Sequence, residues 1–488
     1  MINLNITAAA EEHIVPAAQY GHFAEHLGRC IYDGFWAEEG CTKRSPEGYR
    51  TDVLEAMQKL HIPVLRWPGG CFADDYHWRD GIGAPQQRKR RLNATWGWVA
   101  ENNRFGTHEF FRLCALLGCD AYLAANMGSG TVQEMSEWIE YVTSDFDTDV
   151  VRERRANGRE SAWKLPYLGI GNEVWGGGGF MTADHYSDLY RNWQHFARNF
   201  NDMDRPMMKI ACGPNAGDYH WTERIMARVD AGMMQGLSLH YYTVPTGNWD
   251  HKGDAVEFTE EEYLQTIRSA LFMEELITKH SEIMDKYDPE KKVALIVDEW
   301  GTWYDVTEGT PEAFLYQQNT MRDAVIAACT LHIFHRHTDR VKMANLAQTV
   351  NVLQALILTE GDRMVCTPTY HVFDLFQPHK DALLLDLAGE VPVVDGLPAV
   401  SVIATKKNDS VCISMCNPTL TDHAVTLDIG TVAAAVQSAQ ILTGDCHACN
   451  TFDAPEAVVP VAFTDYSVAE GKLTVSLPAC SVAVLILQ

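Results

Sequence analysis

Two short motifs place a glutamate where a predicted apolar strand ends. Glu173 follows the segment YLGI in YLGIGNEVWGGGG, and Glu299 follows VALIVD in VALIVDEWGTWY. Two carboxyl groups can act on one bond as acid/base and nucleophile if the fold brings them together. The two glutamates lie far apart in the chain, so only a fold that gathers strand ends could pair them. A solvated turn at the first motif and an exposed Asp-Glu pair at the second are the alternative interpretations.

The residues that follow these glutamates suggest how a site could be built around them. Trp300 and Trp303 come shortly after Glu299, and we expect them to flank the acids as apolar walls, where desolvation and neighbouring charges set carboxyl pKa values. The glycine run after Glu173 would let a ligand approach the backbone. The same segment does not match the dinucleotide-binding fingerprint, because Val174 stands where the third glycine is required.

A third motif near the N-terminus resembles a metal site. His22, Glu25 and His26 form H-x-x-E-H, a zinc-peptidase pattern that requires both histidines on one face of a helix. Here the motif follows a predicted strand and is bracketed by Gly21 and Gly28. We therefore favour a substrate-binding role for Glu25 and keep a zinc peptidase as a distant alternative.

The elements that must position these residues alternate between apolar strands and amphipathic helices. Such alternation predicts β-α units around a parallel sheet. Eight units favour an α/β fold, a (β/α)8 TIM barrel, over residues 18–375. The predicted strands lie near residues 18–23, 64–67, 121–126, 167–172, 209–213, 237–242, 293–299 and 341–346.

Polar residues cluster at the predicted carboxyl ends of these strands. In a TIM barrel, the carboxyl-end face carries the catalytic residues. We therefore expect one site at this face. The residues at or just past the strand ends are Arg66, Asn126, Asn172, Glu173, His240, Asp298, Glu299 and Gln348.

The last part of the chain has a different pattern. From residue 376 to 488, β-branched residues alternate along short segments such as VSVIAT and VCISMC, with turn residues between them. This pattern predicts a β-sandwich domain, jelly-roll-like in form. Within residues 1–17, Ile2, Leu4 and Ile6 also alternate and could add an edge strand to the sandwich.

Composition limits the partners and the compartment. The 488 residues include 39 Lys and Arg against 65 Asp and Glu, a net charge of −26 that would repel nucleic acid and anionic membranes. No apolar segment approaches the length of a membrane span or has the form of a signal peptide. Thirteen scattered cysteines favour reduced thiols, so we expect a cytoplasmic protein.

Several motifs together resemble glycoside hydrolase family 51, the α-L-arabinofuranosidases. They occur in the family's order from residue 20 to about 375. The resemblance implies a catalytic barrel with a C-terminal β-sandwich, retaining hydrolysis of arabinose-containing oligosaccharides, no metal or other cofactor, a cytoplasmic location and a homo-oligomer, commonly a hexamer. The motifs are YGHFAEHLGRCIYDGFW, LRWPGGCFADDYHWRDGIG, GIGNEVWG, LSLHYYT, VDEWGTWY and LAQTVNVLQALI.

The resemblance also assigns roles to residues. Glu173 looks like the general acid/base and Glu299 like the nucleophile, with Arg66 and Tyr242 beside it to favour its charged form. Another retaining barrel glycosidase, such as a β-xylosidase or an endoglucanase, remains the nearest alternative. The implied substrate-binding residues are Glu25, Cys71, Asn172, Tyr242 and Gln348, and the supporting ones are Arg66, His240, Trp300 and Trp303, with Trp96 or Trp98 as possible stacking platforms.

Overall fold

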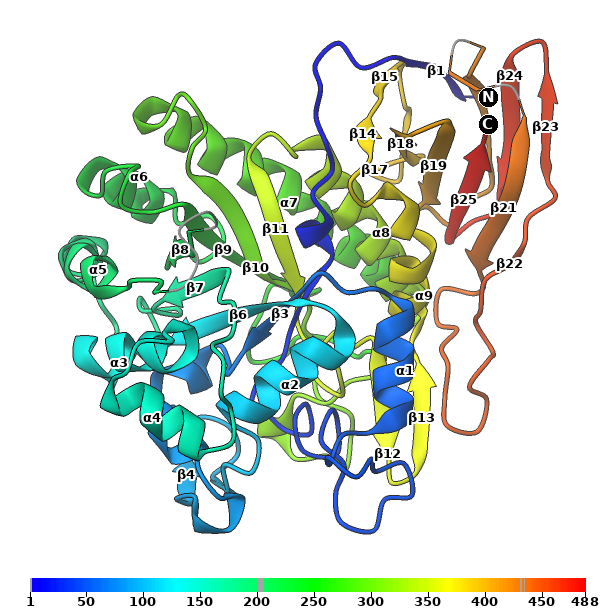
Figure 1. The fold of residues 1–488 in the computed structure, drawn as a ribbon. Coiled ribbons are helices and arrows are strands. Elements are labelled where there is room, and N and C mark those ends of the chain that lie inside the picture. Colours follow the sequence, from blue (N-terminus) through cyan, green and yellow to red (C-terminus); the bar gives the residue numbers. More distant parts are fainter. Residues whose placement is uncertain (1, 201–205, 431, 434) are drawn as a thin grey trace.

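The chain forms a barrel and a β-sandwich that lie side by side (Figure 1). The structure, a computed structural model, describes residues 2–200, 206–430, 432–433 and 435–488. Within these residues, eight parallel strands close into a barrel in the order β10-β11-β2-β3-β6-β7-β8-β9, which confirms the predicted TIM barrel. The strands are β2 (Gly21–Phe23), β3 (Val64–Trp67), β6 (Asp120–Ala125), β7 (Tyr167–Ile170), β8 (Met208–Ala211), β9 (Gly236–Thr243), β10 (Ala294–Thr302) and β11 (Val341–Leu346).

Helices surround the barrel, and local sequence signals set their ends. In α2, the Glu109 side chain accepts a hydrogen bond from the Gly106 amide at the start, and Gly118 ends the helix with a φ of 71°. None of the described helices is both long and apolar enough to cross a membrane. The helices are α1 (Thr51–Lys59), α2 (Thr107–Leu117), α3 (Val132–Thr143), α4 (Asp149–Ala156), α5 (Ala183–Phe196), α6 (Tyr219–Arg228), α7 (Glu260–Tyr287), α8 (Met321–Arg336) and α9 (Pro368–Leu375).

The first barrel strand is shorter than predicted. Residues Ala17–Tyr20 form a 3-10 turn, and only Gly21–Phe23 pair as β2. The Gln19 amide donates to the carbonyl of Pro16, and its side chain donates to the carbonyls of Phe334 and Val341. The segment therefore caps the bottom of the barrel before it enters the sheet.

Two sheets form the sandwich, beyond α9. One has the order β15-β1-β20-β24-β23 and the other β14-β18-β19-β25-β21-β22. The first contains β15 (Asp386–Ala388), β1 (Ile2–Thr7), β20 (His423–Asp428), β24 (Lys472–Leu477) and β23 (Tyr466–Ala469). The second contains β14 (Leu383–Leu384), β18 (Ser401–Lys407), β19 (Ser410–Asn417), β25 (Ser481–Leu487), β21 (Val436–Thr443) and β22 (Val461–Ala462).

The N-terminal strand does not form the edge of its sheet, as the sequence suggested it could. β1 pairs in parallel with β20 on one side and antiparallel with β15 on the other. Ile2, Leu4 and Ile6 are buried in the sandwich core. The short β15 covers the outer side of β1 and supplies the edge instead, which leaves fewer unpaired backbone groups on β1.

A buried cluster of histidines joins the two parts of the molecule. His332 on α8 contacts the hydroxyls of Ser401 and Ser414, at 2.9 and 2.8 Å. His379 contacts the same Ser414 hydroxyl and that of Thr405, both at 2.8 Å. Burial lowers the pKa of His379 to about 3 and holds the pKa of His332 well below its usual range. Both rings are therefore neutral in the folded protein.

We expect this cluster to make the protein acid-sensitive. Unfolding exposes these histidines, which then take up protons near their ordinary pKa of about 6.5, so stability is lost as the pH falls below that value. Each neutral buried histidine contributes a loss of about 1.4 kcal/mol per pH unit. Glu25 and Asp74, with pKa values raised to about 7, and Asp323 and His240, whose pKa values are also raised, act in the opposite direction but are fewer than the histidines whose pKa is lowered.

Urea unfolding between pH 7 and pH 5 measures this effect. The urea concentration at the unfolding midpoint should fall as the pH is lowered from 7 to 5. Substitution of the exposed His61 by Gln should leave this dependence on pH unchanged. A midpoint that stays constant or rises over this range would contradict neutral buried histidines.

Candidate active site

A pocket of about 540 Å3 opens at the carboxyl ends of the barrel strands. Its volume lies within the range of small-molecule sites, roughly 300 to 1,000 Å3. The pocket brings together side chains from strands that are distant in the sequence. Eight of the residues predicted from the sequence line it: Glu25, Cys71, Trp96, Glu173, Tyr242, Glu299, Trp303 and Gln348.

Glu299 is held by a cation and a hydroxyl. Arg66 Nη1 donates to its Oε1 at 2.8 Å, and the Tyr242 hydroxyl donates to its Oε2 at 2.7 Å. Burial and the charge of Glu299 hold the pKa of Tyr242 well above its usual range, so the hydroxyl keeps its proton and remains a donor. These contacts orient both oxygens of Glu299.

An irregularity in β10 explains how Asp298 and Glu299, which are consecutive in the chain, can both contact residues of the site. The strand's register with β9 shifts between Ile296 and Glu299. Such a bulge changes the direction of the side chains that follow it. Asp298 is therefore available to Arg66 and His240, while Glu299 lines the pocket.

Trp300 does not flank the acids, and the prediction for it was wrong. Its side chain is buried outside the barrel, where it contacts Phe334 of α8 and Phe373 of α9, with ring centres 5.3 and 6.3 Å away. Neighbouring residues of a strand point to opposite faces, so a pocket-facing Glu299 directs Trp300 outward. Trp303, further along the chain, lines the pocket and packs edge-on against Tyr242.

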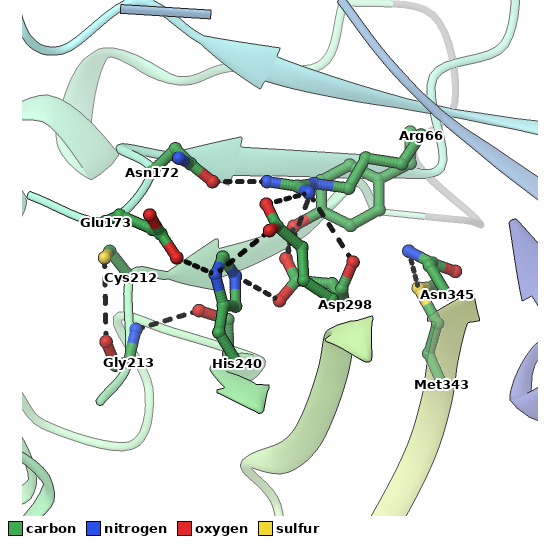
Figure 2. A network of polar contacts seen from close by, with 12 residues as sticks. Arg66, Asn172, Glu173, Cys212, Gly213, His240, Asp298, Met343 and Asn345 are labelled. Carbon is green, nitrogen blue, oxygen red and sulfur yellow. Dashed lines mark hydrogen bonds and ion pairs between the residues drawn. The ribbon is translucent and has the colours of Figure 1, made fainter. Parts of the chain in front are cut away.

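Glu173 is linked to the other acids through His240, as Figure 2 shows. His240 Nδ1 lies 2.8 Å from Glu173 Oε1, and Nε2 lies 3.0 Å from Asp298 Oδ1. Burial would lower the pKa of His240, but Glu299 and Asp298 outweigh it and raise this pKa to about 10. The imidazolium can thus donate to Glu173 and form an ion pair with Asp298. Glu173 has a φ of 39°, an uncommon conformation that often marks functional positions.

The two glutamates are close enough to act on one bond. One carboxylate oxygen of Glu173, one of Glu299 and a ring nitrogen of His240 all lie within 4.8 Å of one another. In retaining glycosidases the two carboxyl groups are about 5 to 5.5 Å apart, whereas inverting enzymes separate them by about 6.5 to 9.5 Å to admit a water molecule. The observed spacing matches the retaining arrangement.

Opposite these acids, Glu25 and Gln348 form part of a buried wall. Glu25 accepts hydrogen bonds from the Phe72 amide, Trp96 Nε1 and Gln348 Nε2, at 3.0, 2.9 and 2.8 Å. Burial and the charge of Glu299 raise the pKa of Glu25 to about 7, although the three donors oppose the shift. This wall offers acceptors and an amide for the hydroxyls of a small ligand. Trp98, by contrast, is 73% exposed and does not line the pocket.

Asn172 and Cys71 adjoin this arrangement in different ways. Asn172 Oδ1 accepts from Arg66 Nη2 at 2.6 Å, while Nδ2 is buried without a hydrogen-bond partner among the described residues. Arg66, Asn172 and His240 are not among the residues that line the pocket, but each contacts a residue beside it or within its lining. The Cys71 thiol lies 3.6 Å from Glu173 Oε2, and burial, then the charge of Glu173, holds its pKa well above the usual range. Cys71 therefore presents a neutral thiol.

The H-x-x-E-H motif does not form a metal site in the described residues. His26 Nδ1 contacts Glu101 at 2.9 Å, and His26 Nε2 accepts a hydrogen bond from Trp67. His22 packs against Phe373 instead. The motif lies on a strand and the turn after it, so its three side chains diverge, and the zinc-peptidase alternative is wrong on this geometry.

Several residues of the pocket could not be located from the sequence. Trp175, Asn215, Trp249 and Phe272 all line it. Trp175 lies two residues after Glu173, within the motif GNEVWG, which is a usable signal. The other three lie in loops or on the face of α7, where the strand pattern gives no information about which residues point inward.

Comparison with known proteins places the chain in a family. The model of the α-L-arabinofuranosidase 1 domain matches residues 56–262, and the model of the α-L-arabinofuranosidase C-terminal domain matches residues 298–481. A GH51 arabinofuranosidase structure from Xanthomonas axonopodis pv. citri is 46% identical, with a TM-score of 0.96 and 100% of both chains covered. The chain belongs to glycoside hydrolase family 51.

Two further relatives agree with this assignment. An intracellular exo-α-L-arabinofuranosidase from Bacteroides ovatus is 48% identical, over 99% of this chain and 95% of the relative. The structure of a Thermotoga maritima α-L-arabinofuranosidase in complex with arabinose is 29% identical, with a TM-score of 0.88 and 100% of each chain covered. The resemblance found in the sequence motifs is therefore confirmed at the level of the family.

Proposed function

We propose that the protein is a retaining, exo-acting α-L-arabinofuranosidase, which removes terminal non-reducing α-L-arabinofuranosyl residues from arabinan- or arabinoxylan-derived oligosaccharides. The spacing of Glu173 and Glu299, with oxygens within 4.8 Å, carries this proposal. Membership of family 51 and the names of its relatives support the choice of arabinofuranose as the sugar.

The first step is the attack of Glu299 on the anomeric carbon while Glu173 protonates the leaving oxygen. Arg66 and Tyr242 orient the Glu299 carboxylate toward that carbon. The Tyr242 hydroxyl donates to Glu299 Oε2. The same oxygen lies 3.6 Å from His240 Nδ1, the nitrogen that contacts Glu173. The product is a covalent glycosyl-enzyme, and the leaving group departs with the proton.

In the second step, Glu173 takes a proton from water, which attacks the anomeric carbon and releases Glu299. His240 holds Glu173 in place through both steps, since its other nitrogen is paired with Asp298. The two inversions retain the configuration of the sugar.

The burial of one wall of the pocket supports exo action. Glu25 and Gln348 are 2% and 1% exposed and are joined by a hydrogen bond. A buried wall at this end of the pocket supports the binding of a terminal ring. The unpartnered Asn172 amide and the polar atoms of this wall are the groups we assign to the hydroxyls of the furanose, with Cys71 packing beside the ring.

Another retaining barrel glycosidase remains the alternative, because two glutamates at this spacing can serve many sugars. Turnover of 4-nitrophenyl α-L-arabinofuranoside should exceed that of the corresponding β-D-xyloside and β-D-glucoside by at least about tenfold, or 1.4 kcal/mol. Comparable turnover of all three glycosides would refute a pocket specialised for arabinofuranose.

Substitution of Tyr242 by Phe tests the contact with Glu299. The change removes one hydroxyl donor to a charged group and leaves the ring against Trp303, so kcat should fall by roughly ten- to a hundredfold, or about 1.5 to 3 kcal/mol. Tyr241→Phe is the matched control, because its hydroxyl donates to the Ser269 carbonyl instead of a carboxylate, and kcat should fall less. Unchanged kcat in Tyr242→Phe, with a native unfolding temperature, would contradict the role given to Tyr242.

We also propose a cytoplasmic location and a homo-oligomer, by resemblance a hexamer. The name of the Bacteroides ovatus relative and the thirteen free thiols of this chain support the location. Light scattering at micromolar concentration would give the mass of the assembly, and a monomer would refute the hexamer.

A further inference from the structure

Beyond the furanose site, the pocket has two continuations on different sides. On one side, Phe272 of α7 lines both the pocket and a groove of about 630 Å3 along α7, called here the α7 groove. On the other side, Trp249, Trp303 and Leu315 line both the pocket and a second groove of about 660 Å3, called here the β10 groove. A longer substrate could follow either one.

The positions of the two glutamates distinguish these continuations. Glu173 follows β7. Trp175 and Asn215, which line the pocket toward the α7 groove, follow β7 and the neighbouring β8 and so lie on the same side of the barrel. Trp175 donates to the Gly213 carbonyl, and Asn215 pairs with His240. Trp303 and Tyr242, by contrast, pack against each other beside Glu299. The leaving oxygen of a glycoside must face the acid/base, so the departing part of the substrate lies on the Glu173 side.

The passage to the α7 groove is formed by aromatic side chains. The Tyr241 hydroxyl donates to the Ser269 carbonyl at 2.5 Å, which ties β9 to α7. Phe272 packs edge-on against Tyr241, with ring centres 5.9 Å apart, and is 37% exposed. A partly exposed aromatic ring at the rim of a sugar pocket offers an apolar surface to the face of a sugar ring.

The residues of the α7 groove suit a ligand that carries hydroxyl groups and no charge. Glu274, Glu275 and Glu282 line it together with Arg268 and Lys279. Lys279 pairs with Glu275, Glu274 pairs with Arg336 and His337, and Arg268 pairs with Glu261, so the surplus negative charge among the described residues of the groove comes from Glu282. Carboxylates accept hydrogen bonds from sugar hydroxyls but repel uronate or phosphate groups.

We propose that the α7 groove binds the leaving-group side of a neutral glycan, so that several sugar units beyond the scissile bond pass over Phe272 and along α7. This inference rests on the proposed function and names its substrate class: a neutral oligosaccharide with a chain beyond the scissile bond, in preference to a short glycoside. The α7 groove, and not the β10 groove, then determines the preference for chain length.

The test compares linear arabino-oligosaccharides with 4-nitrophenyl α-L-arabinofuranoside. In the wild-type protein, kcat/KM should rise from arabinobiose to arabinotetraose. Phe272→Ala should lower kcat/KM for arabinotetraose about fivefold relative to that for the aryl glycoside, the effect of losing one aromatic contact. Trp249→Ala, which removes an aromatic residue shared with the β10 groove, is the matched control and should leave this ratio within about twofold of wild type.

Three results would overturn the proposal: no rise of kcat/KM with chain length, an unchanged ratio in Phe272→Ala, or a fall of the ratio in Trp249→Ala instead. An equal loss on both substrates in Phe272→Ala would also overturn it, because Phe272 would then support the furanose site itself. Failure of the proposed function is distinct, since the wild-type protein would then not hydrolyse the aryl arabinofuranoside at all.

Discussion

Glu299→Gln should lower kcat for the aryl arabinofuranoside by at least about 10⁴-fold, because no covalent glycosyl-enzyme can form without the carboxylate nucleophile. The amide oxygen of glutamine can still accept from Arg66, which now contacts Glu299 at 2.8 Å, so the fold should be retained. Initial rates and thermal unfolding of the same preparation measure both effects.

An exposed glutamate close by serves as the control for this substitution. Glu308 lies in the loop after β10 and does not line the pocket, so Glu308→Gln should keep the wild-type rate. Turnover of Glu299→Gln within about tenfold of wild type, in a folded protein, would exclude Glu299 as the nucleophile.

Glu173→Ala should affect substrates according to their leaving groups. For an oligosaccharide, whose leaving oxygen needs a proton, kcat/KM should fall by about 10² to 10⁴-fold. For a 2,4-dinitrophenyl arabinofuranoside, the first step needs no acid, so a burst of dinitrophenol should be followed by a slow phase in which the glycosyl-enzyme accumulates. Stopped-flow absorbance separates the two phases, and mass spectrometry detects the adduct.

This prediction has its own control within the site. Glu173→Gln preserves the size of the side chain and an acceptor for His240, 2.8 Å away, but cannot exchange a proton. It should show the same dependence on the leaving group as Glu173→Ala. An equal fold-loss on both substrates in either variant would contradict acid/base catalysis by Glu173.

The sequence predicted those residues of the site that lie at the ends of barrel strands. Glu173 and Glu299 follow apolar strands, and a closed parallel barrel necessarily collects such positions at one face. Arg66 and Tyr242 follow the same rule. They contact Glu299 in the structure because β3 and β9 end at the same rim.

Other features depend on geometry that residue patterns do not encode. The register shift in β10 allows Asp298 to pair with Arg66 and His240 while Glu299 lines the pocket, and the regular alternation after Glu299 then turns Trp300 outward. Phe272 lies on a helix whose pattern reveals a partly exposed face but not the groove that passes it. The covering of β1 by β15 likewise depends on a pairing between segments at opposite ends of the chain.

The configuration of an azide product tests the assignment of the two glutamates most directly. In Glu173→Ala the nucleophile survives, so azide attacks the glycosyl-enzyme, needs no general base and yields the α-azide after two inversions. In Glu299→Ala azide must attack the substrate itself and yields the β-azide after one inversion. NMR of the anomeric proton should therefore show α-azide from Glu173→Ala and β-azide from Glu299→Ala; the opposite pair of products would reverse the roles, and wild-type rates in either variant would remove that residue from the mechanism.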